Sequence, residues 1–338
     1  MSKTDSANAA IGADERRPVH VTHVPPRIER NRPTRPDEIA PIVFVGGTGR
    51  SGTHVLARLI GRNSLYCTIP VECRFHVDPD GFPALLAGEV SKSRFLRRMR
   101  GFWWRGFQTN RMRGMYRFIP KERYDAALAA FDERFDGDPE GACRQLFFDL
   151  LMARARDRGL HGIVEQSCDV IAQAPTLVRL FPEAKFIHVV RDGRDASASR
   201  VSQTRGLVYP RTRRQGLEWW EKRIRAIDAG ARAIPEGRFL EVSLDELVEG
   251  PRRGALVPIA NFVGVRPGPR LRRFYFGQMR ADRGNFERWR RDISARKAAD
   301  IDARYRAALE RLEADGITCA PLLRRTYERR RQRELDKG

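Results

Sequence analysis

The stretch PIVFVGGTGRSGTHVLARLIG, from Pro41 to Gly61, decides the fold. Its apolar segment, Ile42 to Val45, predicts a buried strand, and the residues from about Ser51 to Arg62 predict a helix. The glycine-rich turn between them would offer backbone N–H groups and the positive end of a helix dipole to a phosphate-like dianion. An ordinary glycine-rich connection between a strand and a helix is the alternative interpretation.

The turn lacks the lysine of a nucleotide triphosphatase. In the Walker A pattern G-x-x-x-x-G-K-[ST], a lysine and a hydroxyl residue follow the second glycine. Counting from Gly47, Gly52 fits this pattern, but Thr53 stands at the lysine position and His54 at the hydroxyl position. The sequence therefore predicts a phosphate cradle that is poorly suited to a triphosphate.

A second strand–turn–helix unit is FIHVVRDGRDASASR. Its strand is predicted over Lys185 to Asp192, and its helix over Arg194 to Ser202. Arg191 ends the strand beside the start of the helix, which indicates a second anion pocket. A surface arginine without a ligand would explain this spacing nearly as well.

The remaining pattern alternates strands and helices. Short apolar runs predict strands at 162–165 and 238–243, and helices are predicted at about 174–181 and 213–233. This alternation predicts an α/β fold of three layers, with a central parallel sheet flanked by helices on both faces. Ligands of such sheets bind beyond the carboxyl ends of the strands, where both glycine-containing turns fall.

The chain divides into three parts by composition. Residues 1–38 are polar and interrupted by prolines, which predicts a flexible arm. Residues 39–320 form the predicted catalytic domain, with a helical insertion at about 79–158 whose first half interleaves arginine with aromatic residues. Residues 321–338 are expected to be a basic C-terminal tail.

The charge balance favours anionic ligands. The 338 residues carry a net charge of +21, mostly from arginine, and such a field attracts nucleic acid, anionic membranes or small polyanions. Solvated arginine on every face is an equally simple explanation. The sequence shows neither a signal-peptide pattern nor a membrane span, and its five cysteines have no metal-binding spacing, so we expect reduced thiols in a cytoplasmic protein.

Two motifs and a connecting segment resemble one enzyme family. The stretches GGTGRSGTHVLARLI, RLFPEAKFIHVVRDGRDASAS and EVSLDELVEGPRRGALVPIANFVGV are similar to sulfotransferases that use 3′-phosphoadenosine 5′-phosphosulfate (PAPS). Among these, tyrosylprotein sulfotransferases and their bacterial relatives are the most similar. The resemblance covers roughly 41–75 and 160–265, and implies a P-loop-like fold and PAPS as the donor.

The resemblance also implies which residues bind the donor. The first loop would hold the 5′-phosphosulfate, through Gly49, Arg50, Ser51, Gly52, Thr53 and His54. The family's arginine and the serine eight residues after it bind the 3′-phosphate, and here these are Arg191 and Ser199. The segment NFERWRRDIS resembles one that closes over the nucleotide, which nominates Arg288 and Trp289.

Glu72 is the candidate base. The segment VECRFH resembles the family's Glu-x-Arg, in which the glutamate accepts the acceptor's proton, and Arg74 would contact the acceptor or the leaving group. A solvated loop carboxylate is the alternative role for Glu72. His54 and His76 are rival bases, whereas His188 lies mid-strand and is expected to be packed in the core.

Two positions depart from the family pattern. Gln166 stands where tyrosylprotein sulfotransferases carry a lysine, so we expect Arg50 or another arginine to supply the missing cation. Leu244 stands where a tyrosine is common, so a contact with the nucleotide would be lost. Trp219 and Trp220 are expected to fix the long helix to the sheet.

The leading prediction is thus a PAPS-dependent sulfotransferase that needs no metal and acts on a hydroxyl of a carbohydrate, a peptidyl tyrosine or a small alcohol. An anionic acceptor would suit the basic insertion. A nucleotide-dependent kinase is the first alternative, although it would require Mg²⁺. A basic protein that binds nucleic acid or a membrane surface, with bases stacking on Phe102, Trp103, Trp104 or Tyr116, is the second.

Overall fold

The computed structural model describes residues 40–106 and 114–336. The predicted N-terminal arm and the middle of the arginine-aromatic stretch lie outside these residues. A five-stranded parallel sheet in the order β2-β3-β1-β4-β5 forms the centre. Its strands are β1 (Ile42–Gly47), β2 (Tyr66–Thr68), β3 (Gly162–Glu165), β4 (Lys185–Val190) and β5 (Phe239–Ser243). The predicted α/β fold with a parallel sheet is confirmed, because each strand is followed by helices that return the chain to the same edge.

The sheet buries both of its faces, and β1 shows why. Its residues are apolar without interruption, and successive side chains of a strand point to opposite faces. Ile42 and Phe44 join one hydrophobic cluster, whereas Val43 and Val45 join another. The second cluster is completed by α1 (Thr53–Ile60), α10 (Leu244–Glu249), α11 (Val257–Phe262) and α12 (Pro269–Gln278).

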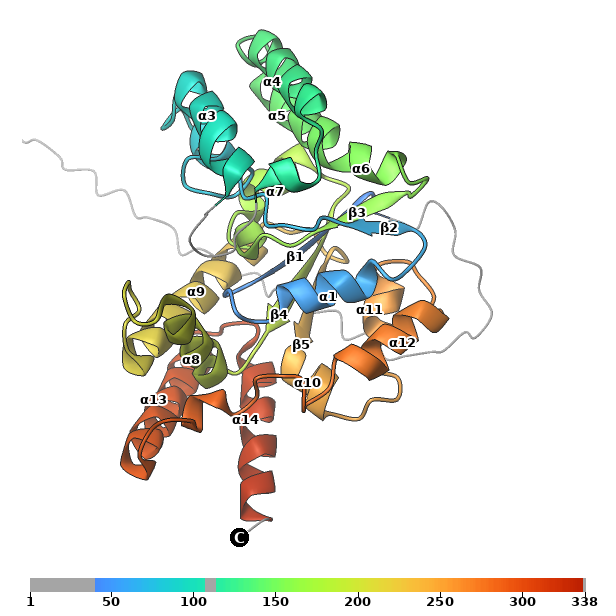
Figure 1. Cartoon of the computed structure of the whole chain (residues 1–338). Coiled ribbons are helices and arrows are strands. Elements are labelled where there is room, and N and C mark those ends of the chain that lie inside the picture. The colour runs from blue at the N-terminus through green and yellow to red at the C-terminus, as the bar shows by residue number, and fades with distance from the viewer. Residues whose placement is uncertain (1–39, 107–113, 337–338) are drawn as a thin grey trace, which may run out of the picture.

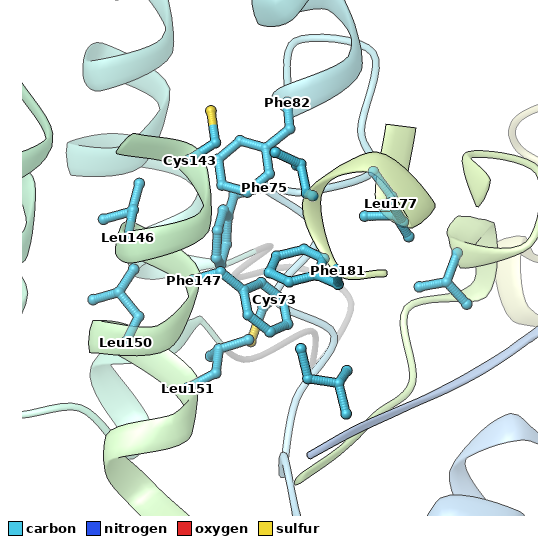
Figure 2. Close-up of a cluster of buried hydrophobic side chains, with 14 of the residues drawn as sticks. Cys73, Phe75, Phe82, Cys143, Leu146, Phe147, Leu150, Leu151, Leu177 and Phe181 are labelled. Atoms are coloured by element: carbon cyan, nitrogen blue, oxygen red, sulfur yellow. The ribbon is translucent and has the colours of Figure 1, made fainter. Parts of the chain in front are cut away.

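The predicted insertion is helical in its described part and covers the other face of the sheet. Figure 1 shows its helices on the side of the molecule opposite to the C-terminal helices. The elements are α2 (Phe82–Leu86), α3 (Lys92–Arg98), η2 (Met99–Trp103), η4 (Met115–Arg117), α4 (Lys121–Phe135), α5 (Pro139–Phe147), η5 (Phe148–Met152) and α6 (Ala153–Arg156). Phe147 of α5 packs against Phe181, which follows α7 (Ala174–Leu180), and against Phe75 (Figure 2). The insertion therefore shares one core with the sheet.

The aromatic residues of the insertion are mostly packed inside it. Trp103 is buried, and its Nε1 donates to Oδ2 of Asp78 at 2.9 Å. Phe102 and Trp104 pack against the same core, and only Tyr116 of the four is an exposed large side chain. The prediction that bases could stack on Phe102, Trp103 and Trp104 is therefore wrong for Trp103, because the core covers its ring.

A third cluster joins the end of the sheet to the C-terminal helices. It contains α8 (Gly193–Thr204), α9 (Arg213–Ala231), α13 (Ala295–Ala314) and α14 (Ala320–Leu335). Trp220 of α9 is fully buried against Tyr305 of α13, as expected of a residue that anchors the long helix. No helix among the described residues is long and apolar enough to cross a membrane.

The expected basic tail is instead mostly a packed helix, α14. Ala320, Leu323 and Tyr327 are buried at helical spacing, and Arg330 continues the same stripe. The guanidinium of Arg330 contacts three buried carboxylates, those of Asp192 at 3.1 Å, Asp195 at 3.0 Å and Asp245 at 2.7 Å. Arg330 thus links the C-terminal helix to the turn that follows β4.

Removal of this arginine tests how strongly the fold depends on α14. We expect Arg330→Met to lower the free energy of unfolding by about 3–5 kcal/mol, because it leaves buried carboxylates without their partner. The measurement is urea denaturation at pH 7.5, with Arg331→Met as the control. Arg331 lies next to it on α14 but is exposed, so its substitution should change stability by less than about 0.5 kcal/mol.

The same comparison at lower pH tests the cause. Burial and the neighbouring Asp192 raise the pKa of Asp195 to about 6 even with Arg330 present. A carboxyl group whose pKa is higher in the folded state destabilises the fold as pH rises through that value. The difference in free energy of unfolding between Arg330→Met and the control Arg331→Met should therefore be smaller at pH 5 than at pH 7.5. Equal stability of the two variants at both pH values would contradict a charge-pairing role for Arg330.

Candidate functional site

The loop after β1 has the backbone of an anion cradle. Gly49 and Gly52 have φ angles of 83° and 100°, and Arg50 between them has a φ of 61°. Glycine adopts such left-handed conformations without strain, whereas most other residues do not. No side chain caps the N-terminus of α1, so its first N–H groups are left for solvent or a ligand.

Ser51 supports the same interpretation. Its side chain is fully buried, yet its Oγ has no hydrogen-bond partner among the described residues. A Cβ atom on Gly47 would lie 2.2 Å from this Oγ, so the loop closes in this way only with glycine there. An orphaned hydroxyl next to exposed helix N–H groups fits an anionic ligand.

The second predicted anion site lies beside the first. Because β1 and β4 are neighbouring parallel strands, the turn that starts at Arg191 adjoins the loop around Arg50. Nη1 of Arg191 donates to the Arg50 carbonyl oxygen at 2.8 Å, and Nε of Arg50 donates to Ser199 Oγ at 3.0 Å. The three residues predicted to contact the two ends of a nucleotide donor are therefore brought together.

Glu72 lies at the edge of this cradle. Its Oε1 is 3.1 Å from Nε2 of His54, the second residue of α1, and its Oε2 accepts from Nη1 of Arg74 at 3.3 Å. Burial alone would raise the pKa of the Glu72 carboxyl, but His54 and Arg74 outweigh it and hold the pKa below the usual glutamate value. Glu72 is therefore a carboxylate at neutral pH, able to accept a proton.

Arg74 is held in place from several sides. Its φ is 62°, its backbone N–H donates to Ser167 Oγ at 3.2 Å, and its Nη2 lies 2.6 Å from Oδ1 of Asp78. Burial alone would lower the pKa of Arg74, but the carboxylates of Asp78 and Glu72 raise it. Since Asp78 also accepts from Trp103, the insertion is connected to Glu72 through Asp78 and Arg74.

Several residues of the site were missed by the sequence analysis. The thiol of Cys168 lies 3.6 Å from Oε1 of Glu72, and Arg223 of α9 pairs with Asp169. The ring of Trp219 lies beside Gly49, and the guanidinium of Arg200 lies 5.7 Å from the centre of that ring. Trp219 thus borders the loop, in contrast to the core position of Trp220.

Arg200 shows that this region has an excess of cations. Burial lowers the pKa of Arg200, and the nearby charges of Arg223 and Arg74 lower it further. Its Nε is buried and has no hydrogen-bond partner among the described residues. Arg200 ends the stretch FIHVVRDGRDASASR, but no spacing rule marks it, and Trp219 and Arg223 come from α9, so only the folded chain shows that they lie beside the loop.

The residues at the departures from the family pattern are both buried. Nε2 of Gln166 donates to the Ile69 carbonyl oxygen at 2.9 Å, and Leu244 packs under Gly52. His76, a rival base in the sequence analysis, is fully buried and lies 3.1 Å from Oε2 of Glu165. It is a core residue, because aromatic rings enclose it.

The two residues predicted from the NFERWRRDIS segment differ in position. Arg288 donates to Ser202 Oγ of α8 at 2.8 Å, on the exposed side of that helix. Trp289 is buried at 2% exposure in the third core cluster, where its ring covers the guanidinium of Arg194. Trp289 thus packs against α8 in this structure, and its contact with the nucleotide stays a prediction.

One group of metal-ligand side chains lies under the sheet. His188, Glu241 and Cys319 have ligand atoms within 4.8 Å of one another. Nδ1 of His188 is 2.8 Å from Oε1 of Glu241, so these two side chains pair with each other, whereas Nε2 of His188 has no hydrogen-bond partner among the described residues. His188 is packed in the core as predicted, and all five cysteines are unpaired thiols.

Residues 41–266 match the sulfotransferase family. Solved structures with similar folds include the sulfotransferase domain of the olefin synthase of Synechococcus PCC 7002, with 20% identity and a TM-score of 0.46 over 76% of this chain and 90% of that one. The sulfotransferase domain of the curacin biosynthetic pathway has 17% identity and a TM-score of 0.44 over 72% and 80% of the two chains. A sulfotransferase of Mycobacterium tuberculosis H37Rv has 14% identity and a TM-score of 0.43 over 72% and 73%.

The family match includes β1 with its loop, Glu72, Arg191 and Ser199, and it ends just after α11. It spans about two thirds of the sequence, and the parallel sheet and the two adjoining turns lie within it. The chain belongs to the sulfotransferase family.

Proposed function

We propose that this protein transfers the sulfuryl group of PAPS to an acceptor hydroxyl, with Glu72 as the general base. The observation that carries the proposal is the position of the Glu72 carboxylate, within hydrogen-bond distance of His54 on α1 and next to an arginine. A base must reach both the loop that holds the transferring group and the acceptor. In a family of sulfotransferases, this carboxylate is the side chain near the loop best suited to that task.

The residues of the loop and of the β4 turn would divide the donor between them. The N–H groups of the loop and the hydroxyls of Ser51 and Thr53 would bind the 5′-phosphosulfate. Arg191 and Ser199 would bind the 3′-phosphate, and this second charge would distinguish PAPS from nucleotides that lack it. PAPS would supply the sulfuryl group when bound, and the adenosine 3′,5′-bisphosphate portion would leave as 3′-phosphoadenosine 5′-phosphate (PAP).

The reaction is a single displacement at sulfur. The acceptor oxygen forms a bond to sulfur while the bond from sulfur to the bridging oxygen breaks, and that oxygen keeps the electron pair. Glu72 takes the acceptor proton, which its lowered pKa permits at neutral pH. No metal takes part in the proposed step, because arginines provide the positive charge.

Arg50 is the proposed substitute for the family's lysine. Gln166 carries no charge and already donates to a backbone carbonyl. Arg50 belongs to the loop itself and donates to Ser199, so its guanidinium adjoins both proposed phosphate sites. Arg74, directed at Glu72 and held by Asp78, would contact the acceptor or the leaving group.

The acceptor class follows from the same region. A carbohydrate hydroxyl, a peptidyl tyrosine or a small alcohol could each present oxygen to Glu72. Arg200 and Arg223 border Cys168 and Asp169 on the Glu72 side of the loop, which supports an acceptor that carries negative charge. A nucleotide-dependent kinase is the alternative function, and it would bind ATP with Mg²⁺ in place of PAP.

Titration calorimetry with PAP tests the donor site. We expect binding that does not depend on a metal and that weakens about 10- to 100-fold in Arg191→Ala, because charge-assisted hydrogen bonds to the 3′-phosphate are lost. Ser199→Ala should weaken it by a few fold. Arg179→Ala, which removes an exposed side chain of α7 that pairs with Glu140, is the control and should bind PAP like the wild type. Binding of Mg-ATP without any binding of PAP would instead support the kinase.

Glu72→Gln tests the base. The variant keeps the size of the side chain, so we expect PAP affinity to stay within about 3-fold of the wild type. Transfer of labelled sulfate from PAPS to a panel of tyrosine peptides, sugars and alcohols should fall by about 10²–10⁴-fold. Glu89→Gln, an exposed glutamate of the insertion, is the matched control. Full turnover in Glu72→Gln would remove Glu72 from the mechanism.

The pH dependence separates Glu72 from the rival base His54. With Glu72 as base, kcat/KM for the acceptor that reacts fastest should stay constant from pH 8 to pH 5, because the carboxylate remains ionised there. A histidine base would instead lose about 5-fold in activity between pH 6.5 and pH 5.5. His54→Asn should raise the pH at which activity begins to fall on acidification, because it removes a hydrogen bond that lowers the pKa of Glu72.

A further inference from the structure

The loop between α8 and α9 exposes three consecutive apolar side chains. Leu207, Val208 and Tyr209 are 75%, 55% and 56% exposed. The other large apolar side chains that are exposed in the described ranges, Tyr116, Phe276 and Leu335, are isolated in sequence. Scattered exposed apolar residues are normal, whereas a contiguous group marks an interaction site.

The backbone of this apolar tip, Leu207–Tyr209, is held in shape. Arg205 and Gly206 have φ angles of 52° and 68°, and they end α8 with a hydrogen bond from the Gly206 N–H to the Val201 carbonyl oxygen. Leu207 N–H donates to the Thr204 carbonyl oxygen at 3.0 Å. On the other side, Arg211 N–H donates to Gln215 Oε1 at 2.9 Å. The tip therefore presents its side chains from a defined loop.

Arginines surround the apolar tip. Arg205 and Arg211 flank it directly, are exposed, and form no ion pair with a carboxylate of the described chain. Arg214 follows in the first turn of α9 and pairs at 3.3 Å with Glu218. Arg288, bonded to Ser202, adds a further cation from the segment before α13. The acidic groups that face this region are Glu218, Asp292 and Asp300, and Asp300 pairs with Arg304, so positive charge predominates.

We propose that this loop, residues 205–214, is a membrane-contact site that docks the enzyme on an anionic lipid surface. The apolar tip would enter the boundary between headgroups and acyl chains, with the tyrosine ring at headgroup level. Arg205, Arg211 and Arg214 would remain among the lipid phosphates, whose charge complements theirs. This site lies outside the proposed donor and acceptor sites and does not depend on them.

A membrane fits the tip better than a protein partner does. A stable protein interface needs about 800 Å² and 20–30 residues on each side, whereas this tip supplies three apolar residues. Interfacial binding to a membrane combines a small inserted apolar area with attraction of basic residues to anionic lipids. Nucleic acid would use the arginines but gain little from leucine and valine, which cannot stack on bases.

The position of the loop determines which side of the protein would face the membrane. Figure 1 shows α8 and α9 at the edge of the molecule opposite to α11 and α12. Ser199, which contacts Arg50, precedes Arg205 by about six residues of helix, or roughly 9 Å. The candidate site would therefore open close to the lipid surface.

Vesicle sedimentation with the full-length protein tests the proposal. A variant that replaces the three apolar side chains separates insertion of the tip into the membrane from the general attraction of a protein of net charge +21 to anionic lipid. Vesicles of phosphatidylglycerol with phosphatidylcholine, and of phosphatidylcholine alone, are compared at 0.15 M salt. L207S/V208S/Y209S leaves the charge unchanged, and we expect it to lower binding to the anionic vesicles at least 10-fold. Phe276→Ser removes an isolated exposed ring and should bind like the wild type.

Three further measurements complete the test. R205Q/R211Q should also bind anionic vesicles at least 10-fold more weakly than the wild type. On these vesicles, Tyr209→Trp should show a blue-shifted tryptophan fluorescence that brominated lipids quench. Thermal unfolding and PAP binding must match the wild type in each variant. Unchanged vesicle binding of the apolar triple variant, or no quenching of Tyr209→Trp, would overturn the proposal. Conversion of a dimer to a monomer by the triple variant would assign the tip to a second copy and overturn it as well.

Discussion

The parallel pairing of β1 with β4 is the constraint on which the rest of the site depends. Gly47 pairs with Val189, so both strands end at the same edge, and the turn after each strand faces the other. Arg191 then joins the turns through the Arg50 carbonyl oxygen. A sheet in which these strands were separated would leave two weak anion sites in place of one site that can span both ends of a nucleotide.

Local sequence signals predicted the elements that form this edge. The apolar run of β1, the glycine turn and the apolar run of β4 are short-range patterns, and the structure has strands, turns and helices where they predict them. Trp219, Arg200 and Arg223 could not be found in this way, because they reach the loop only through the packing of α8 and α9, and Cys168 reaches Glu72 from the segment after β3. Trp289 packs against α8, and its contact with the nucleotide stays a prediction.

The C-terminal helix shows a second limit of pattern analysis. Ala320, Leu323 and Tyr327 form a helical stripe whose next member is Arg330, so a charged residue occupies a position that the fold buries to 2% exposure. A buried arginine is tolerated here because Asp192, Asp195 and Asp245 surround it. Asp192 and Asp195 belong to the turn and the helix start that directly follow Arg191. No local rule links residue 330 to residue 192. Only the folded chain shows that the anion-binding turn is supported from behind by a charge from α14.

This support has a consequence for how the protein is made. Synthesis runs from the N-terminus, so the strands, both turns and α8 leave the ribosome before Arg330 does. Until then three acidic side chains destined for the interior have no counter-charge from α14, and water must solvate them. The turn after β4 therefore acquires its final surroundings only after α14 has been synthesised. A chain that terminates early would carry complete motifs on an unfinished core, which makes it a target for chaperones and proteases.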